Sequence, residues 1–215
     1  MSGETTLPLA MPRFVVIDVE TSGFSARRDR ILQVAAVEID SRGAVVNEWS
    51  SFVRPRFGRV GPTHVHGLTA ASLRSAPAFR VVAPELARQL EGAVVVGHNI
   101  DFDWAFVRRS LKRSRVPLAP TARLCTLDLS RSLDPDRLMR HKLADICSRL
   151  DVPLDNAHDA LADARATAEV LGHLLHSAHL DGTTLVSHRA YRSTTNPGRP
   201  RRRKRWWHRR LKRQR

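Results

Sequence analysis

The stretch that most constrains the fold is Phe14-Val15-Val16-Ile17-Asp18-Val19-Glu20, in which apolar residues give way to two acids. Four of its five apolar residues are β-branched, as is typical of a strand buried on both faces of a sheet. Strand side chains alternate between faces, so Asp18 and Glu20 point the same way, roughly 6–7 Å apart. Two carboxylates at this short distance stay charged only where cations or hydrogen-bond donors offset their repulsion and lost hydration. The pattern fits either a site for a hard divalent ion or a strand that runs into a polar turn.

The positive charge of the chain is concentrated at one end. The 215 residues carry a net charge of +15, and 11 Arg or Lys lie between positions 199 and 215, where there is no acid. Without that segment the net charge is only +4. This distribution predicts a polyanionic partner, which is either a nucleic acid or an anionic membrane surface.

The sequence predicts a soluble cytoplasmic protein. Two cysteines, Cys125 and Cys147, are too few for a disulfide framework and lie in no paired metal motif, which favours a reducing compartment. Residues 1–12 lack the basic region and apolar run of a secretory signal, and no apolar stretch approaches the roughly 18 residues of a membrane span.

Apolar patterning predicts an α/β fold. Three strand patterns joined by short turns, at 14–20, 30–40 and 44–53, predict an antiparallel meander. Strand and helix patterns then alternate, which predicts a mixed sheet with helices on both faces. The remaining strands are expected at 93–97 and 122–125, and helices at 69–75, 79–90, 102–112, 126–132, 142–150 and 157–177.

Composition divides the chain into four parts. Residues 1–12 are expected to be a flexible leader, and residues 13–178 the folded domain. Residues 179–198 are rich in Ser, Thr, Gly and Pro and are interpreted as a linker. Residues 199–215 form a basic tail that is too charged to build a core, so we expect it to be disordered.

Two further acid-bearing segments follow later in the chain. Asp103 comes after the Val-rich strand and begins a helix, a place where α/β sheets build sites but also where an acid simply complements the helix dipole. Asp163 lies among Ala and Leu residues on a predicted helix, so its carboxylate needs a partner, and a metal shared with Asp18 is one candidate. His158 and Asp163 would not share a helix face, so His158 is expected in the loop entering that helix.

Together these motifs carry a family resemblance. The chain contains three motifs in this order: Asp18-Val-Glu20-Thr, His98-Asn-x-x-Phe-Asp103 and His158-x-Ala-x-x-Asp163-Ala. In order and approximate spacing they resemble the motifs of the DEDD exonuclease superfamily in its histidine form (DEDDh). The chain is similar to the branch of proofreading exonucleases of bacterial DNA polymerase III and ribonuclease T, over residues 13 to about 177. The resemblance implies a ribonuclease H-like, mixed five-stranded sheet flanked by helices.

The resemblance also implies the chemistry. Two Mg²⁺ or Mn²⁺ ions would be held by Asp18, Glu20, Asp103 and Asp163, and His158 would be the general base. Imidazole titrates near neutral pH, so it can take a proton from an attacking water. The implied activity is 3′→5′ exonucleolytic hydrolysis of single-stranded ends, releasing nucleoside 5′-monophosphates.

The turn after the first strand and two later loops are candidates for substrate contact. Backbone groups and an aromatic ring near the turn can hold the terminal nucleotide, although Phe24, Leu68 and Phe102 can equally be core residues. The expected substrate-binding residues are Thr21, Gly23, Phe24, His66, Gly67, Leu68, Asn99 and Phe102.

Partners and substrate remain open at this level. We expect single-stranded DNA, in proofreading or repair; an RNA 3′-end-processing enzyme and a polymerase-associated subunit that needs its partners are the alternatives. The tail combines cations with aromatic residues, which suits unpaired bases and phosphates, although an anionic membrane surface or a solubilising or docking role fits its composition too. The tail residues expected to contact nucleic acid are Arg201, Arg202, Arg203, Lys204, Arg205, Trp206 and Trp207.

Overall fold

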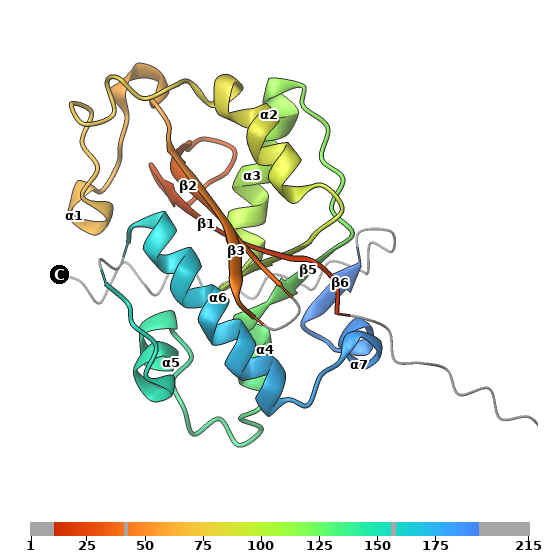
Figure 1. Cartoon of the computed structure of the whole chain (residues 1–215). Coiled ribbons are helices and arrows are strands. Elements are labelled where there is room, and N and C mark those ends of the chain that lie inside the picture. Colours follow the sequence, from red (N-terminus) through yellow and green to blue (C-terminus); the bar gives the residue numbers. More distant parts are fainter. Residues whose placement is uncertain (1–10, 41–42, 156–157, 194–215) are drawn as a thin grey trace, which may run out of the picture.

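The computed structural model describes residues 11–40, 43–155 and 158–193. Six strands form one sheet in the order β3-β2-β1-β4-β5-β6 (Figure 1). The strands are β1 (Phe14–Thr21), β2 (Ile31–Ile39), β3 (Val45–Phe52), β4 (Val94–Gly97), β5 (Ala122–Cys125) and β6 (Tyr191–Ser193). The first three form the predicted antiparallel meander, β4 and β5 run parallel to β1, and β6 is antiparallel to β5.

Five of the six predicted helices are present, with small shifts at their ends. The helices of the structure are α1 (Thr63–His66), α2 (Phe79–Leu90), α3 (Asp101–Ser114), α4 (Thr126–Ser132), α5 (Leu143–Leu150), α6 (Ala160–Ser177) and α7 (Gly182–Ser187), with a short 3₁₀ turn η1 (Arg56–Gly58). In the described part of the chain, no helix is both long and apolar enough to cross a bilayer.

Three expectations from the sequence were wrong. The sheet has six strands rather than five, because β6 pairs with β5. The segment 179–198, predicted as a linker, contains α7 and β6: Asp181 and Thr184 form a capping box at the start of α7. Residues 69–75 form turns instead of a helix, and the short helix α1 precedes them. The flexible leader (apart from residues 11 and 12) and the basic tail lie outside the described residues.

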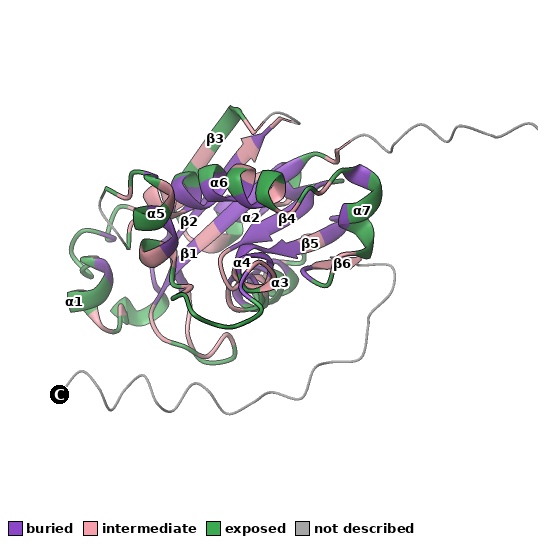
Figure 2. Cartoon of the chain, turned by 90° about the horizontal axis from the view of Figure 1, so that it is seen from below, coloured by how far each residue is buried: buried purple, intermediate pink, exposed green. Residues whose placement is uncertain are grey.

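Helices cover both faces of the sheet, and β1 contributes to two separate cores (Figure 2). Phe14 and Val16 pack in the core that contains α6, whereas Val15, Ile17 and Val19 pack in the core that contains α2 and α3. Every apolar side chain of β1 is at most 5% exposed. Successive side chains of β1 therefore point alternately into two buried cores. The acids at the end of β1 lie on the same face as Phe14 and Val16.

The end of β1 extends beyond its parallel neighbour. The register between β1 and β4 stops at Val16 and Val96, so Asp18, Val19 and Glu20 are paired only with β2 on their other side. The chain turns after β4 into α3, whose first residues therefore lie beside the free edge of β1. This is the type of crevice, at the carboxyl ends of parallel strands, in which α/β sheets build their sites.

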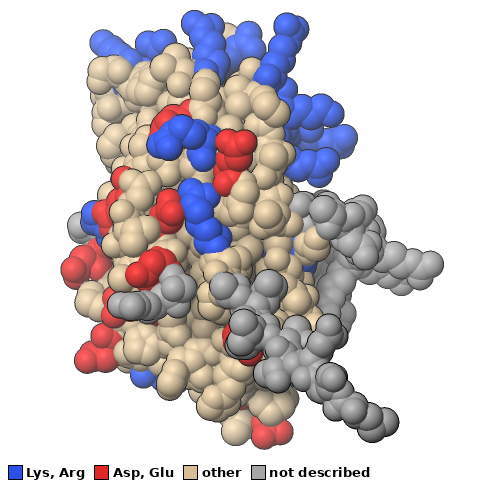
Figure 3. All heavy atoms as spheres, turned by 45° about the vertical axis from the view of Figure 1, so that its right-hand side comes forward, with Lys and Arg blue, Asp and Glu red and all other residues tan. Residues whose placement is uncertain are grey.

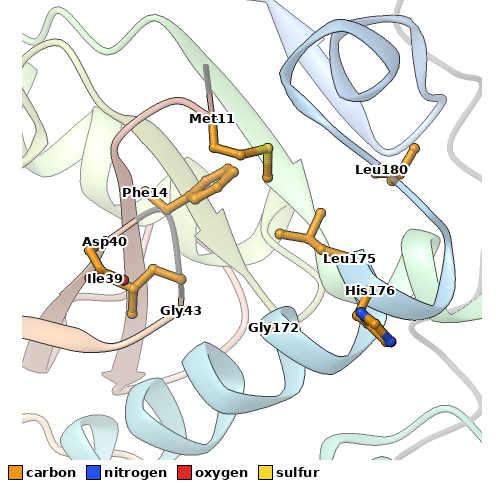
Figure 4. Close-up of a pocket in the computed structure, with 9 residues that line it drawn as sticks. All are labelled: Met11, Phe14, Ile39, Asp40, Gly43, Gly172, Leu175, His176 and Leu180. Atoms are coloured by element: carbon orange, nitrogen blue, oxygen red, sulfur yellow. The ribbon is translucent and has the colours of Figure 1, made fainter. Parts of the chain in front are cut away.

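A pocket of about 250 Å³ lies at the opposite end of β1 (Figure 4). Met11, Phe14, Leu175 and Leu180 line most of its apolar part, and His176 lies at its side. Phe14 is the first residue of β1, whereas the acids follow at its carboxyl end. The pocket and the acidic cluster are therefore separate.

Candidate active site

Two strand acids form the base of the site. Glu20 is only 9% exposed, and Asp18 is also largely screened from solvent. Their positions on β1 put both carboxylates on the face covered by α6, as the alternation predicted.

Asp103 reaches these acids from the first turn of α3. Its side chain is 4% exposed, and its Oδ1 accepts a hydrogen bond of 3.2 Å from the backbone N–H of Val19. That N–H is available because β1 has no β4 partner at this point. An acid that only complemented a helix dipole would face solvent, so the burial of Asp103 against β1 favours the site interpretation.

α6 brings a fourth carboxylate, Asp163, and the loop before it brings His158. The backbone N–H of His158 donates to Oδ2 of Asp163 at 3.3 Å, and His158 adopts a positive φ of 74° immediately before the helix cap. One ligand atom each from Glu20, His158 and Asp163 lies within 4.8 Å of the other two. His158 is exposed and lies outside the helix, as the sequence predicted.

Burial and neighbouring acids raise the pKa values of all four carboxylates. Burial is the largest cause for each of them. The pKa of Asp18 is raised well above its usual value, by burial and then by Asp103 and Asp163. The pKa of Glu20 and that of Asp103 are each raised to about 8. Without a cation, this cluster is therefore partly protonated at neutral pH.

The cluster has the properties of a site for divalent cations. Its donors are mainly carboxylate oxygens, which are the ligands that Mg²⁺ and Mn²⁺ prefer, and the imidazole of His158 lies beside them. Oδ1 of Asp163 is buried and has no hydrogen-bond partner among the described residues. A buried carboxylate oxygen without a donor is costly, and a cation shared with the neighbouring acids would satisfy it.

Two residues that sequence reasoning missed hold this arrangement together. Asp159 caps α6 by accepting hydrogen bonds from the N–H groups of Leu161 and Ala162. Gln33, opposite Glu20 in the sheet, donates from Nε2 to Asp159 at 2.8 Å and accepts from the N–H of Ala160 at 3.3 Å. The sequence contains an indication of each role. Asp159 directly precedes the helix, as a capping residue does, and Gln33 is a lone amide in an apolar strand, where its side chain needs a partner.

The turn that follows β1 is tightly closed. Thr21 donates from Oγ1 to the carbonyl of Gly23 at 2.8 Å. A Cβ on Gly23 would lie 2.6 Å from the Asp29 carboxylate, so only glycine fits there. Phe24 is 57% exposed, which argues against a core role for this ring.

The loop after α1 also approaches the cluster. His66 is buried, with one ring nitrogen 3.1 Å from the carbonyl of Val60 and the other accepting from the N–H of Leu68. Burial lowers the pKa of His66, and the charge of His158 contributes to this shift, so the two rings lie near each other. His66 thus supports the loop, and Gly67 turns it with a φ of 69°.

The predicted contacts around α3 are mixed. Asn99 has a positive φ of 67° in the turn between β4 and α3. Phe102 packs against Phe106, with ring centroids 5.0 Å apart, so the core interpretation holds for at least part of this ring. His98, next to Asn99, is bonded to Thr126 and to the carbonyl of His141, and burial lowers its pKa to about 4. His98 therefore has a structural position outside the cluster.

Comparison with known proteins gives a consistent result. The sequence model of a family described as exonuclease (RNase_T) matches residues 15–171. The chain is 34% identical over 175 residues to a PolC-type DNA polymerase III of Caldanaerobacter subterraneus, covering 81% of this chain and 12% of that protein. It is 35% identical over 167 residues to the 3′-5′ exonuclease DinG of Bacillus subtilis, covering 76% of this chain and 18% of that protein. The chain thus spans less than a fifth of either relative.

Solved structures share the fold. Exonuclease X, in complex with 5′-overhanging duplex DNA, superposes with a TM-score of 0.63 at 25% identity, covering 79% of this chain and 95% of that one. A zinc-bound complex of Escherichia coli exonuclease I with single-stranded DNA superposes with a TM-score of 0.72 at 20% identity, covering 83% of this chain and 43% of that one. The second similarity is one of fold alone.

Proposed function

Because this chain belongs to the RNase_T family of DEDD-type exonucleases, we propose that it is a metal-dependent 3′→5′ exonuclease that removes nucleoside 5′-monophosphates from single-stranded DNA ends. The observation that carries the proposal is the convergence of four carboxylates and one imidazole from three distant segments of the chain. Burial raises the pKa of Asp18, and the charges of Asp103, Asp163, Glu20 and Asp159 raise it further, which supports a shared site for these acids.

Asp18, Glu20, Asp103 and Asp163 would hold two divalent ions. Such ions supply an activated nucleophile and stabilise the negative charge that develops on a phosphodiester. The partnerless Oδ1 of Asp163 and the mutual repulsion of the acids support this assignment. Asp103 is fixed by the N–H of Val19, and Asp163 by that of His158, so their carboxylates are oriented before any ion binds.

His158 would be the general base. It is exposed, so it can meet the water that attacks the scissile phosphorus, and it lies beside Glu20 and Asp163. The water oxygen bonds to phosphorus while the imidazole takes the water proton; the P–O3′ bond breaks, and the oxygen of the shortened strand receives a proton. The products are a nucleoside 5′-monophosphate and a new 3′-hydroxyl end.

The substrate end would lie between the turn after β1 and the loop after α1. Exposed Phe24 offers a ring to a terminal base, and backbone groups of Thr21 and Gly23 border it. Leu68 and Gly67 would form the opposite wall, and the hydrogen bond from the N–H of Leu68 to the His66 ring would hold this loop in place. A ring that stacks on a base favours an unpaired end.

DNA is the proposed substrate because one relative is a DNA polymerase III and exonuclease X was solved in complex with DNA. The similarity to PolC-type polymerases also favours a second possibility, in which the chain acts as a subunit of a polymerase or repair complex. A stand-alone exonuclease degrades DNA as an isolated protein, whereas a subunit that depends on its partners does not.

The experiment uses the purified full chain with 5′-labelled oligonucleotides of DNA and RNA in Mg²⁺ or Mn²⁺. We expect a ladder of progressively shortened labelled DNA, which reports loss from the 3′ end, and slower degradation of RNA. Asp18→Ala should abolish the ladder, whereas Asp136→Ala, at an exposed acid away from the cluster, should not. Immediate release of the labelled nucleotide, or equal activity of Asp18→Ala, would overturn the proposal.

A further inference from the structure

A group of arginines gathers where α3 ends against the loop that follows the first catalytic strand. Arg113 of α3 donates from Nη2 to the backbone carbonyl of Arg27 at 2.7 Å, which ties the helix to this loop. Arg109 lies four residues before Arg113 on α3, so both side chains are on the same face of the helix. Burial lowers the pKa of Arg113, and the charges of Arg30 and Arg109 lower it further. We call Arg27, Arg30, Arg109 and Arg113 the α3–loop cluster.

The cluster has few countercharges. From residue 104 to residue 127 the sequence contains no acid, although Arg108, Lys112 and Arg115 add to its positive charge. None of the four cluster arginines makes an ion pair within the described residues, whereas Arg13, Arg88 and Arg165 elsewhere do. The one nearby acid, Asp29, accepts a hydrogen bond from the N–H of Ser25 inside the loop. Figure 3 shows Lys and Arg side chains crowding the upper end of the molecule, where α3 ends.

The cluster is directly continuous with the proposed cleft. The loop that carries Arg27 and Arg30 is closed by two bonds between Ser22 and Arg30, only two residues after Glu20. Phe24 belongs to the same loop. A strand whose last base lies at Phe24 therefore has the cluster as its neighbouring surface.

The spacing along α3 fits a nucleic-acid strand. Asp103 and Arg113 are ten residues apart on one helix, which is about 15 Å along its axis. A stacked strand rises about 3.4 Å per nucleotide along its axis, and an extended single strand rises more, so this span corresponds to roughly two to four nucleotides. Arg109, six residues from Asp103, lies about 9 Å away on the same basis.

We propose that the α3–loop cluster binds backbone phosphates of the substrate roughly two to four nucleotides upstream of the scissile bond. The inference rests on the proposed nuclease function and extends it to a second contact that makes activity depend on substrate length. Cations in a last helical turn also complement the helix dipole, but that effect needs no more than one or two charges and does not explain Arg27 and Arg30 on the facing loop.

The experiment measures the kinetics of the full chain on two substrates. One is a p-nitrophenyl ester of thymidine 5′-monophosphate, which occupies only the catalytic centre; the other is a 5′-labelled DNA oligonucleotide of about 20 nucleotides. The main variant is Arg27→Gln combined with Arg109→Gln, because the tie between Arg113 and residue 27 uses a backbone carbonyl and survives it. Arg27→Lys with Arg109→Lys keeps both charges, and Arg189→Gln removes an exposed charge elsewhere.

The Gln double variant should raise KM for the oligonucleotide about 5- to 20-fold, with the kinetics of the ester unchanged. The slope of log KM against log salt concentration should decrease by about 1.4. Each lost phosphate contact with a single strand accounts for about 0.7, and the variant loses two. The Lys double variant and Arg189→Gln should keep the original slope. An unchanged slope, an equal loss on both substrates, or a loss of binding only to vesicles of anionic phospholipid would overturn the inference. If the wild type hydrolyses neither substrate, the proposed function fails; oligonucleotide binding in EDTA, with its salt slope, then still tests the cluster.

Discussion

The side-chain amide of Gln33, near the start of β2, donates a hydrogen bond of 2.8 Å to the carboxylate of Asp159, the cap of α6. The same amide accepts from the N–H of Ala160. This pair of bonds fixes the start of α6 relative to the strand that faces Glu20. Because His158 and Asp163 flank this helix start, their placement depends on Gln33, although its side chain is not assigned any chemical role.

Gln33→Ala should lower kcat by about tenfold or more while KM changes little, because the helix start loses its fixed position. It should also reduce the free energy of unfolding by about 1–3 kcal/mol, since the N–H of Ala160 loses its partner in a buried place. Steady-state kinetics and urea unfolding measure the two effects.

Asn47→Ala is the matched control for Gln33. The Asn47 amide donates to Gln89 at 2.9 Å between β3 and α2, away from the cluster. It should change stability without changing kcat. If both variants lower kcat in proportion to their loss of stability, Gln33 has no positioning role.

The sequence predicted most of this fold because its elements are marked by local patterns. The Val-rich run at β4 and the helical spacing at α2 define those elements within one residue. β6 was missed because a three-residue strand in a polar segment has no periodicity, and its place depends on pairing with β5. The pair Arg192 and Asp101, which joins β6 to α3, is equally invisible in a single sequence.

The sequence predicted the acids and the histidine of the site but not the residues that hold them in place. Carboxylates in three motifs were visible because apolar surroundings make acids conspicuous. Whether they converge depends on the register of β1 and β4, which leaves the N–H of Val19 free for Asp103. The link between Gln33 and Asp159 spans 126 positions, so no local pattern could show it.

His158→Gln should lower kcat by about 10²–10⁴-fold with KM changed only a few-fold, because it removes a general base while leaving the carboxylates. Mn²⁺ should still raise the melting temperature of this variant. That result separates a base from a metal ligand, since the ligand atoms of His158, Glu20 and Asp163 lie near enough for either role.

His173→Gln, at an exposed histidine on α6, is the control for His158 and should behave as wild type. A His158→Gln protein that retains wild-type kcat would remove the base assignment. One that loses its response to Mn²⁺ would instead make His158 a ligand.

Deleting residues 199–215, which lie outside the described residues, should weaken DNA binding and flatten its dependence on salt, because 11 cations are removed. Fluorescence anisotropy in EDTA measures this without hydrolysis. The kinetics of the nucleotide ester should not change. An unaltered salt slope would show that the tail binds something other than nucleic acid.

The metal-free protein should lose stability as pH rises from about 5.5 to 8.5. The pKa values of Glu20 and Asp103 are about 8 in the folded protein, above the ordinary values of 4.5 and 3.8. The folded state therefore binds more protons than the unfolded state across this range, and stability is lost as pH rises through the folded pKa. A fall of a few degrees in melting temperature is expected, since 1 kcal/mol corresponds to about 2–4 °C in a chain of this size.

Divalent cations should reverse this trend, because they bind the deprotonated carboxylates and stabilise only the folded state. Mn²⁺ should therefore raise the melting temperature more at pH 8.5 than at pH 5.5. Asp18→Asn removes one repelling charge and one ligand, so at pH 8.5 it should be more stable than wild type in EDTA and respond much less to Mn²⁺. Asp18→Asn changes only the cluster, so the difference between the two proteins isolates its acids. An equal Mn²⁺ response in Asp18→Asn and wild type would place the cation elsewhere.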